Sequence, residues 1–302
     1  MARYRKLSEY LRERYKSRVQ KIPIYAGFTC PNRLKGEPCI YCDSTGSGFS
    51  TLMNLPIKDQ VLTWKDRFKK KYKNVKFIAY FQAFSNTFAS VDILRRKYEE
   101  ALVDDEIVAL DISTRPDLLQ EEILDLLEGF KSRVDVFLDI GLQTVNYKTL
   151  KILKRHHTLA EFIDGVSRAK RRGFEITTHV IANLPWDDLE DVIETAKVIS
   201  ALDIDGVKVH SLYVVKGTEL GNMYERGEVS IGTLEEYVQR VVTFLEYLDP
   251  SVVIHRLVAD PPKTGVLFGN WGVSKLEIIN AIEKELEDRD TYQGKKFNYL
   301  NR

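Results

Sequence analysis

The chain has 302 residues, of which 44% are hydrophobic and 29% are charged, and its formal net charge at pH 7 is +1. This length and composition suit a folded protein with a substantial core, and the near-neutral balance argues against a protein coated throughout for polyanions. No apolar run reaches the roughly 18 residues of a membrane-spanning helix, and the charged N-terminus lacks the apolar stretch of a signal peptide, so we expect a cytoplasmic location and no membrane partner.

Basic residues gather in two stretches despite the neutral sum. Residues 1–21 hold eight Lys or Arg against two Glu, and residues 65–76 read KDRFKKKYKNVK. Such stretches are either a local basic face that contacts phosphates or ordinary solvated helix faces. Both interpretations stay open at this point.

Beyond the first basic stretch, short runs rich in β-branched and aromatic residues alternate with amphipathic helical patterns. The predicted strands cover residues 22–27, 75–81, 106–113, 134–142, 175–183 and 205–215. Apolar stripes of helical spacing lie at 57–68, 118–130 and 189–199, and capping-box pairs begin two late helices at Thr233 and Ser274. Strands separated by helix-length connections predict a parallel sheet, which places the chain in the α/β class as a partial (β/α)6 TIM-like barrel.

No proline- or glycine-rich linker divides the chain. We therefore predict a basic N-terminal extension over residues 1–19, a core domain over 20–257 and a C-terminal helical extension over 258–302. In barrels of this type the chemistry lies at the C-terminal ends of the strands. A loop that directly follows the first strand is therefore expected at the catalytic rim.

That loop contains every cysteine of the chain, as Cys30, Cys39 and Cys42 in CPNRLKGEPCIYC. An odd, clustered set of thiols indicates metal binding or catalysis rather than disulfides. A [4Fe–4S] cluster usually takes four thiolates, one per iron, so three thiolates leave one iron free to bind a small molecule. The competing interpretation is a structural zinc site, which normally uses four protein ligands, and the nearest histidine in the sequence is His156.

The segment CIYC resembles the cluster loop of radical S-adenosylmethionine (SAM) enzymes, although the spacing here is C-x8-C-x2-C in place of the usual C-x3-C-x2-C. The similarity continues in order through AGFTCPNR, AYFQAFSNT, STRPD, DIGLQT, KRHH, THVIANLP, VKVHSLYVVKGT, VIHR and DTYQGKK. This order resembles the widened-loop radical SAM family related to the elongator catalytic subunit. The DIGLQT and KRHH block is also similar to oxygen-independent coproporphyrinogen III oxidase.

The resemblance implies that Cys30, Cys39 and Cys42 hold a [4Fe–4S] cluster whose fourth iron binds the amino and carboxylate groups of SAM. One electron from a donor such as a flavodoxin or ferredoxin then cleaves the S–C5′ bond, and the resulting 5′-deoxyadenosyl radical abstracts hydrogen from the substrate. The protein's own task is to orient these groups and exclude water and oxygen.

Cofactor contacts follow from the resemblance position by position. The implied cofactor-binding residues are Gln82, Ser85, Asn86, Ser113, Arg115, Gln143, Arg155 and His179. Among them, Gln143 matches a ribose contact and Arg155 matches a contact to the methionine carboxylate. The chain also departs from its relatives at several of these positions. Gln82, Ser85 and Asn86 stand in place of a glycine-rich motif, Ser113 stands where a glutamate is frequent, and His179 stands where coproporphyrinogen III oxidase has an aspartate.

Three residues near the end of the predicted sixth strand, Lys208, His210 and Tyr213, are the candidates for catalysis on the substrate. Lys208 and His210 share one face of the strand because side chains alternate with a period of two. His255 and Arg256 follow the strand-like segment SVVIH and are further candidates for the same rim. The alternative is a polar layer that only satisfies the barrel interior.

The leading hypothesis for the substrate is tRNA, with modification of a wobble-uridine side chain, and the two basic stretches would contact its phosphates. An extruded base would then stack on Tyr213 or Trp186. One alternative keeps the radical chemistry but acts on a small-molecule metabolite. The other is a zinc-containing RNA-binding module without catalysis.

Overall fold

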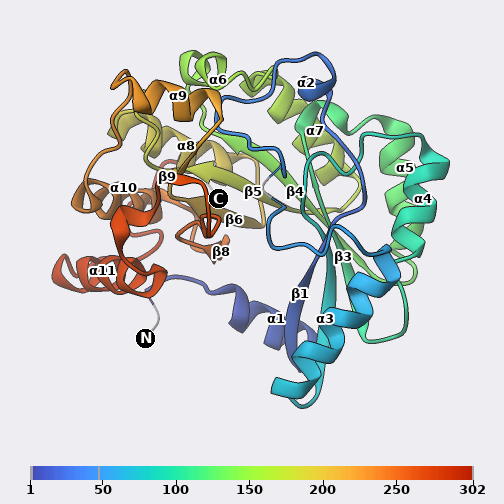
Figure 1. Ribbon diagram of the computed structural model, residues 1–302. Helices are drawn as coiled ribbons and strands as arrows, with labels where there is room; N and C mark the ends of the chain where they lie inside the picture. Colours follow the sequence, from blue (N-terminus) through green and yellow to red (C-terminus); the bar gives the residue numbers. More distant parts are fainter. Residues whose placement is uncertain (1–2, 47, 301–302) are drawn as a thin grey trace.

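The alternating pattern folds into a parallel sheet curled into a half-barrel, in the computed structural model that describes residues 3–46 and 48–300 (Figure 1). Seven strands lie in the order β1-β2-β3-β4-β5-β6-β8, and every neighbouring pair is parallel. Their bounds are β1 (Arg18–Ile24), β2 (Val75–Phe81), β3 (Ile107–Thr114), β4 (Asp135–Gln143), β5 (Glu175–Ile181), β6 (Gly206–His210) and β8 (Val253–Arg256). The expected partial TIM-like barrel is therefore confirmed.

The strand count and one strand boundary differ from the prediction. The sheet has a seventh strand, β8, whose four residues pair with β6 and were too few to predict as more than strand-like. The predicted sixth strand breaks after His210, because the backbone N–H of Leu212 donates to the Asn183 side chain (2.7 Å) instead of continuing the ladder. Its remainder becomes β7 (Val214–Val215), which pairs antiparallel with β9 (Val266–Phe268).

Helices cover the convex face of the sheet (Figure 1). The longer ones are α3 (Ile57–Lys71), α4 (Val91–Glu99), α5 (Glu121–Phe130), α7 (Leu159–Arg171), α8 (Leu189–Ala201), α10 (Leu234–Tyr247) and α11 (Lys275–Asp288). Helix α1 (Leu7–Tyr15) instead packs Leu11 against Ile78, Ala109 and Phe137, on the inner face of the sheet. Short turns of helix are α2 (Pro31–Leu34), α6 (Tyr147–Ile152), α9 (Glu219–Glu225), η1 (Pro116–Leu118) and η2 (Asn270–Gly272). Both predicted capping boxes are present, at the starts of α10 and α11.

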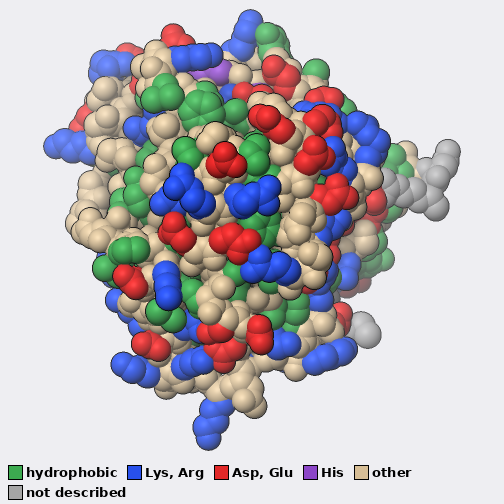
Figure 2. Space-filling model, turned by 90° about the vertical axis from the view of Figure 1, so that its right-hand side faces the viewer, with side chains coloured by type: hydrophobic (Ala, Val, Ile, Leu, Met, Phe, Trp, Pro, Cys, Tyr) green, Lys and Arg blue, Asp and Glu red, His purple; other side chains and the backbone are tan. Residues whose placement is uncertain are grey.

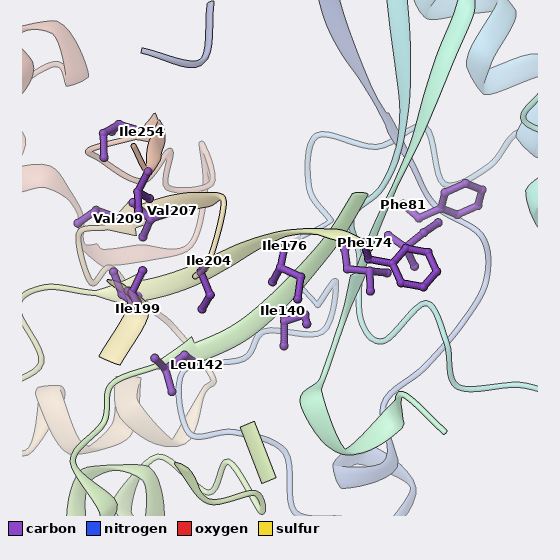
Figure 3. Packing of buried hydrophobic residues seen from close by; sticks show 14 of the residues in the cluster. Phe81, Ile140, Leu142, Phe174, Ile176, Ile199, Ile204, Val207, Val209 and Ile254 are labelled. Carbon is purple, nitrogen blue, oxygen red and sulfur yellow. The ribbon is translucent and has the colours of Figure 1, made fainter. Parts of the chain in front are cut away.

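The main core lies between the sheet and these helices (Figure 3). Ile140 and Leu142 of β4 and Val207 and Val209 of β6 are fully buried in this core. Because side chains alternate across a strand, the residues next to these in the sequence face the interior of the half-barrel, including Asp139 before Ile140 and Lys208 between the two valines. The strand sequences therefore place Asp139 and Lys208 in the lumen.

The first basic stretch closes the open edge of the half-barrel. The N–H of Ile254 in β8 donates to the carbonyl of Arg5 (2.8 Å), and α1 runs from there to the start of β1. Several of its cations form ion pairs, among them Lys6 with Glu283 (2.9 Å) and Arg14 with Asp135 (2.9 Å). This stretch therefore has a structural role at the N-terminal end of the strands.

The second basic stretch also lies at that end, because α3 leads directly into β2. Lys65 is buried and forms ion pairs with Asp104 and with Glu106 (2.8 Å), and Glu106 also pairs with Lys69 (2.6 Å). On the face shown in Figure 2, on the side of α4 and α5, Lys and Arg are interspersed with Asp and Glu. None of the described helices is both long and apolar enough to cross a bilayer.

Candidate functional site

The cysteine loop leaves β1 at the C-terminal end of the sheet, where the sequence places it. Cys30 is the residue before α2, and its carbonyl accepts the N–H of Arg33 (3.0 Å). Cys39 is buried and Cys42 is half-buried, and the N–H of Cys42 donates to the carbonyl of Cys39 (2.9 Å). The loop thus holds three thiols at the rim of the barrel.

Nitrogen donors surround these sulfurs. Arg155 Nη1 lies 3.5 Å from Cys39 Sγ, Arg33 Nη2 lies 3.4 Å from Cys42 Sγ, and Asn32 Nδ2 lies 3.7 Å from Cys39 Sγ. Burial raises the pKa of Cys42 to about 12, the Arg33 guanidinium opposes this shift, and the neighbouring Cys39 and Cys30 thiols add to it. Burial thus favours the neutral thiol of Cys42. Metals bind the thiolate, so a positively charged metal centre would be needed to hold this buried group in its charged form.

The donor set fits a polynuclear cluster. Within residues 3–46 and 48–300, no three His, Cys, Asp or Glu side chains converge closely enough to hold a single metal ion. A [4Fe–4S] cluster makes a different demand, because each thiolate binds a different iron. Cys39 and Cys30 both raise the pKa of Cys42, so the three thiols lie near one another, and guanidinium and amide donors contact two of them. This arrangement meets that demand.

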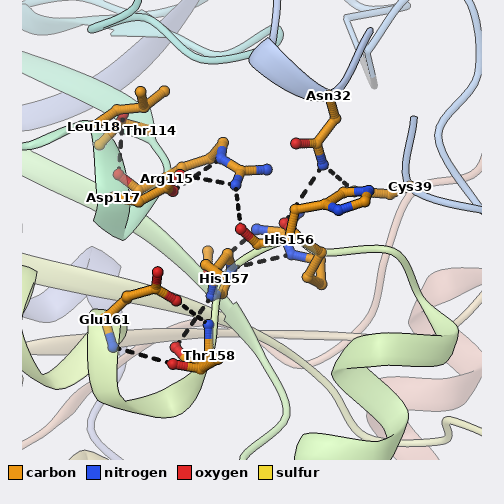
Figure 4. Close-up of polar contacts among 12 residues, drawn as sticks. Asn32, Cys39, Thr114, Arg115, Asp117, Leu118, His156, His157, Thr158 and Glu161 are labelled. Carbon is orange, nitrogen blue, oxygen red and sulfur yellow. Dashed lines mark hydrogen bonds and ion pairs between the residues drawn. The ribbon is translucent and has the colours of Figure 1, made fainter. Parts of the chain in front are cut away.

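The KRHH segment forms the wall beside the cysteines (Figure 4). Besides its contact with Cys39, buried Arg155 donates to the carbonyl of Gly141 (3.2 Å) and to the hydroxyl of Tyr41 (3.2 Å). His157 accepts from Arg155 Nε (3.2 Å) and has its pKa lowered to about 2 by burial and by that guanidinium. Arg155 is therefore held in one position next to the cysteine loop.

The other predicted cofactor residues separate into two groups. Gln82, Gln143 and His179 line one cavity of about 150 Å³ at the C-terminal end of the lumen, which we call the chamber. Gln143 lies at the end of β4 next to a bulge in the pairing with β5, and its φ of 77° is in the left-handed region. Such strain in a non-glycine residue is frequent at functional sites, since it fixes the direction of a side chain.

The remaining cofactor candidates serve the fold around that chamber. Asn86 is buried and donates to the carbonyls of Phe81 (2.9 Å) and Ser113 (3.0 Å). Ser85 is also buried. Arg115 binds Asp117 with two contacts of 2.9 Å and donates to the carbonyl of His156 (3.2 Å), as Figure 4 shows. These three residues and Ser113 do not line the chamber.

Beneath the chamber lies a network centred on Asp139, a residue that our sequence reasoning did not single out. Lys208 forms a buried ion pair with Asp139 and donates to the hydroxyl of Tyr80 (3.0 Å). Ser113 donates to Asp139 (3.2 Å), and His179 Nε2 lies 2.6 Å from the other carboxylate oxygen. A charged residue in the apolar strand segment VFLDIGL was the signal in the sequence.

The charges of this network follow from burial and pairing. Burial would raise the pKa of Asp139, but His179 and Lys208 hold it well below its usual range. Burial lowers the pKa of both His179 and His210, so their imidazoles are neutral at pH 7. The two rings stack with centroids 5.1 Å apart, and His210 Nε2 lies 3.1 Å from His179 Nδ1.

The three catalytic candidates therefore differ in position. His210 and Tyr213 line the chamber, whereas Lys208 lies below it and is committed to Asp139. Arg256 also lines the chamber, but His255 points to a second cavity of about 280 Å³ at the N-terminal end of the lumen. That second cavity is larger, yet in barrels the chemistry belongs to the C-terminal end, so the chamber is the candidate active site.

The family model "Radical SAM superfamily" matches residues 24–199, and the model "Radical_SAM C-terminal domain" matches residues 204–288. The uncharacterized protein YtqA of Bacillus subtilis is 37% identical over 302 residues, which is 99% of this chain and 94% of that protein. A Methanocaldococcus jannaschii protein named tRNA uridine(34) acetyltransferase is 30% identical over 60% of this chain, but over only 33% of its own length.

Two solved structures share the fold. Elp3 of Methanocaldococcus infernus, with an N-terminal deletion, matches with a TM-score of 0.71 and 20% identity over 91% of this chain and 64% of its own. Coproporphyrinogen III oxidase (HemN) of Escherichia coli matches with a TM-score of 0.52 and 14% identity over 81% of this chain and 54% of its own. The family models and the full-length relative agree with the cysteine site at the barrel rim: the chain belongs to the radical SAM superfamily, whose members use a [4Fe–4S] cluster and S-adenosylmethionine.

Proposed function

We propose that this chain modifies the side chain of a wobble uridine in tRNA, for instance by remodelling a carboxymethylaminomethyl group towards aminomethyl. The observation that carries the proposal is the similarity to a protein named for tRNA uridine(34), together with the Elp3-like fold over 91% of the chain. The acetyltransferase activity in that name is not part of the proposal, because the match covers only 33% of the length of the named protein.

Bound cluster and SAM would supply a 5′-deoxyadenosyl radical, by one-electron cleavage of the S–C5′ bond. The chain's residues would do the rest: Cys30, Cys39 and Cys42 hold the cluster, and Arg155 binds the methionine carboxylate. Gln143 and Gln82 orient the nucleoside part of SAM from the wall of the chamber. A flavodoxin or ferredoxin is the expected electron donor, and the cytoplasm is the expected location.

The mouth of the chamber suits an extruded base. Phe49 and Tyr213 both line it, with ring centroids 6.4 Å apart in an edge-to-face arrangement. Phe49 is partly exposed, and aromatic faces at a rim stack on nucleobases whatever their sequence context. Trp186, the other stacking candidate, packs against a hydrophobic cluster behind the chamber instead.

The test uses anaerobically reconstituted protein with SAM, dithionite and tRNA from cells that lack the gene. We expect tRNA to stimulate formation of 5′-deoxyadenosine, and mass spectrometry to detect conversion of one wobble nucleoside. A Cys39→Ser variant is the negative control. Identical nucleoside profiles in cells with and without the gene would refute the proposal.

A small-molecule substrate is the second candidate, and two observations favour it. The chamber measures only about 150 Å³. The basic stretches lie at the far end of the barrel, with several of their cations in ion pairs. Salt dependence separates the candidates, because phosphate contacts make the affinity for RNA fall steeply as salt rises.

A further inference from the structure

The charges around the chamber do not balance. Two of the anions near it have cationic partners: Asp139 pairs with Lys208, and Asp260 pairs with Lys275 (2.7 Å). The two histidines are neutral at pH 7 because burial lowers the pKa of each. What remains is Arg256, the last residue of β8, whose guanidinium is always charged.

Arg256 has a charge without a local partner. No hydrogen bond, ion pair or ring contact joins its side chain to any residue in 3–46 or 48–300. The residue is nevertheless half-buried, and its charge contributes to the lowered pKa values of His179 and His210. Partial burial removes some of the hydration of this guanidinium, and charge-assisted hydrogen bonds to a bound anion would offset that cost.

We propose that Arg256 anchors a carboxylate group of the substrate inside the chamber. The planar guanidinium matches the two oxygens of a carboxylate with two parallel hydrogen bonds. The identity of the molecule that carries the carboxylate rests on the proposed function. With a modified uridine, the base stacks at Phe49 and Tyr213, and its acidic side chain extends to Arg256. A cavity of about 150 Å³ suits a short side chain of this kind.

The first test measures binding of two RNAs to the reconstituted protein: tRNA from cells lacking the gene, and the same tRNA as an unmodified transcript. We expect the wild type to prefer the modified tRNA roughly 10- to 100-fold, the usual worth of a charge-assisted contact. Arg256→Gln should remove this preference. Arg171→Gln, at an exposed arginine at the end of α7, should keep it. An Arg256→Gln variant that retains the preference overturns the proposal.

The second test needs no RNA. Phenylglyoxal modifies accessible guanidinium groups, and mass spectrometry reads the extent at each arginine. We expect acetate to slow modification of Arg256 relative to chloride at equal ionic strength, while Arg171 reacts equally in both. Equal rates for Arg256, or protection by inorganic phosphate but not by acetate, overturn the carboxylate site. Protection by acetate in a protein that converts no tRNA nucleoside supports the site and removes only the proposed function.

Discussion

Replacing Asp139 by Asn leaves the Lys208 ammonium without its buried carboxylate partner. The side chains of Asp139 and Lys208 are 0% and 3% exposed, so water cannot replace the lost charge. Breaking a buried ion pair by removing one partner costs about 3–5 kcal/mol. With an unfolding entropy of about 2.1 cal/mol/K per residue over 302 residues, this lowers the Tm by roughly 5–8 °C.

The assay is thermal unfolding of the reconstituted protein at pH 7, followed by circular dichroism. The folded-state pKa of Asp139 is depressed, so its stabilisation is present above the unfolded pKa of about 3.9 and is lost as the pH falls through the folded value. Measurement at pH 7 therefore captures it in full.

Two controls separate charge burial from a general effect of substitution. Glu99→Gln breaks the ion pair with Arg133, whose side chains are 43% and 52% exposed, and should cost no more than about 1 kcal/mol. Asp139→Asn combined with Lys208→Met should recover much of the loss, since the double variant buries no unpaired charge. The reasoning is refuted if Asp139→Asn unfolds within about 2 °C of Glu99→Gln.

Three further predictions concern the site. Cys42→Ser should reduce bound iron and the visible absorption of the cluster without unfolding the protein, and an unchanged iron content would exclude this residue as a ligand. Gly141→Ala should weaken SAM binding several-fold in calorimetry while the Tm changes little, because the added Cβ meets the side-chain ends Gln143 Nε2 at 2.9 Å and Arg155 Nη2 at 3.0 Å and no backbone atom. His210→Gln should flatten the decline of stability below about pH 6.5: the folded-state pKa is lowered, so the unfolded chain gains protons there and the wild type is destabilised on acidification. Denaturant titrations at pH 7 and pH 5 measure this. If the free energy of unfolding falls by the same amount in the variant and the wild type, the prediction for His210 is wrong.

Local patterns in the sequence were sufficient to predict the cysteine loop, most of the strands and the starts of several helices. Cys30, Cys39 and Cys42 are close in sequence, so their proximity needs no tertiary information. The alternation of apolar residues in β2 to β5 reports burial on the outer face of the sheet directly, because that period is a local property of a strand. The capping boxes at Thr233 and Ser274 are likewise local, and both are present.

Contacts between distant segments could not be predicted in this way. The four residues of β8 form a strand because they pair with β6. The segment before α1 lies at the open edge because the N–H of Ile254 in β8 donates to the carbonyl of Arg5. The basic N-terminal stretch could be a nucleic-acid surface or a structural element until its acidic partners, more than a hundred residues away, were known.

The sequence by itself determined the chemistry of this protein, since three clustered thiols and an ordered set of short motifs indicate a radical SAM enzyme. Only the tertiary structure decided which polar side chains are available to ligands. Lys208 is a catalytic candidate in the sequence, but in the structure its ammonium forms an ion pair with Asp139 below the chamber. Arg256, in contrast, lines the chamber and has no ion-pair partner among the described residues. The physical reason is that availability depends on burial and on charge partners, and both arise when strands β1 to β6 and β8 surround one lumen.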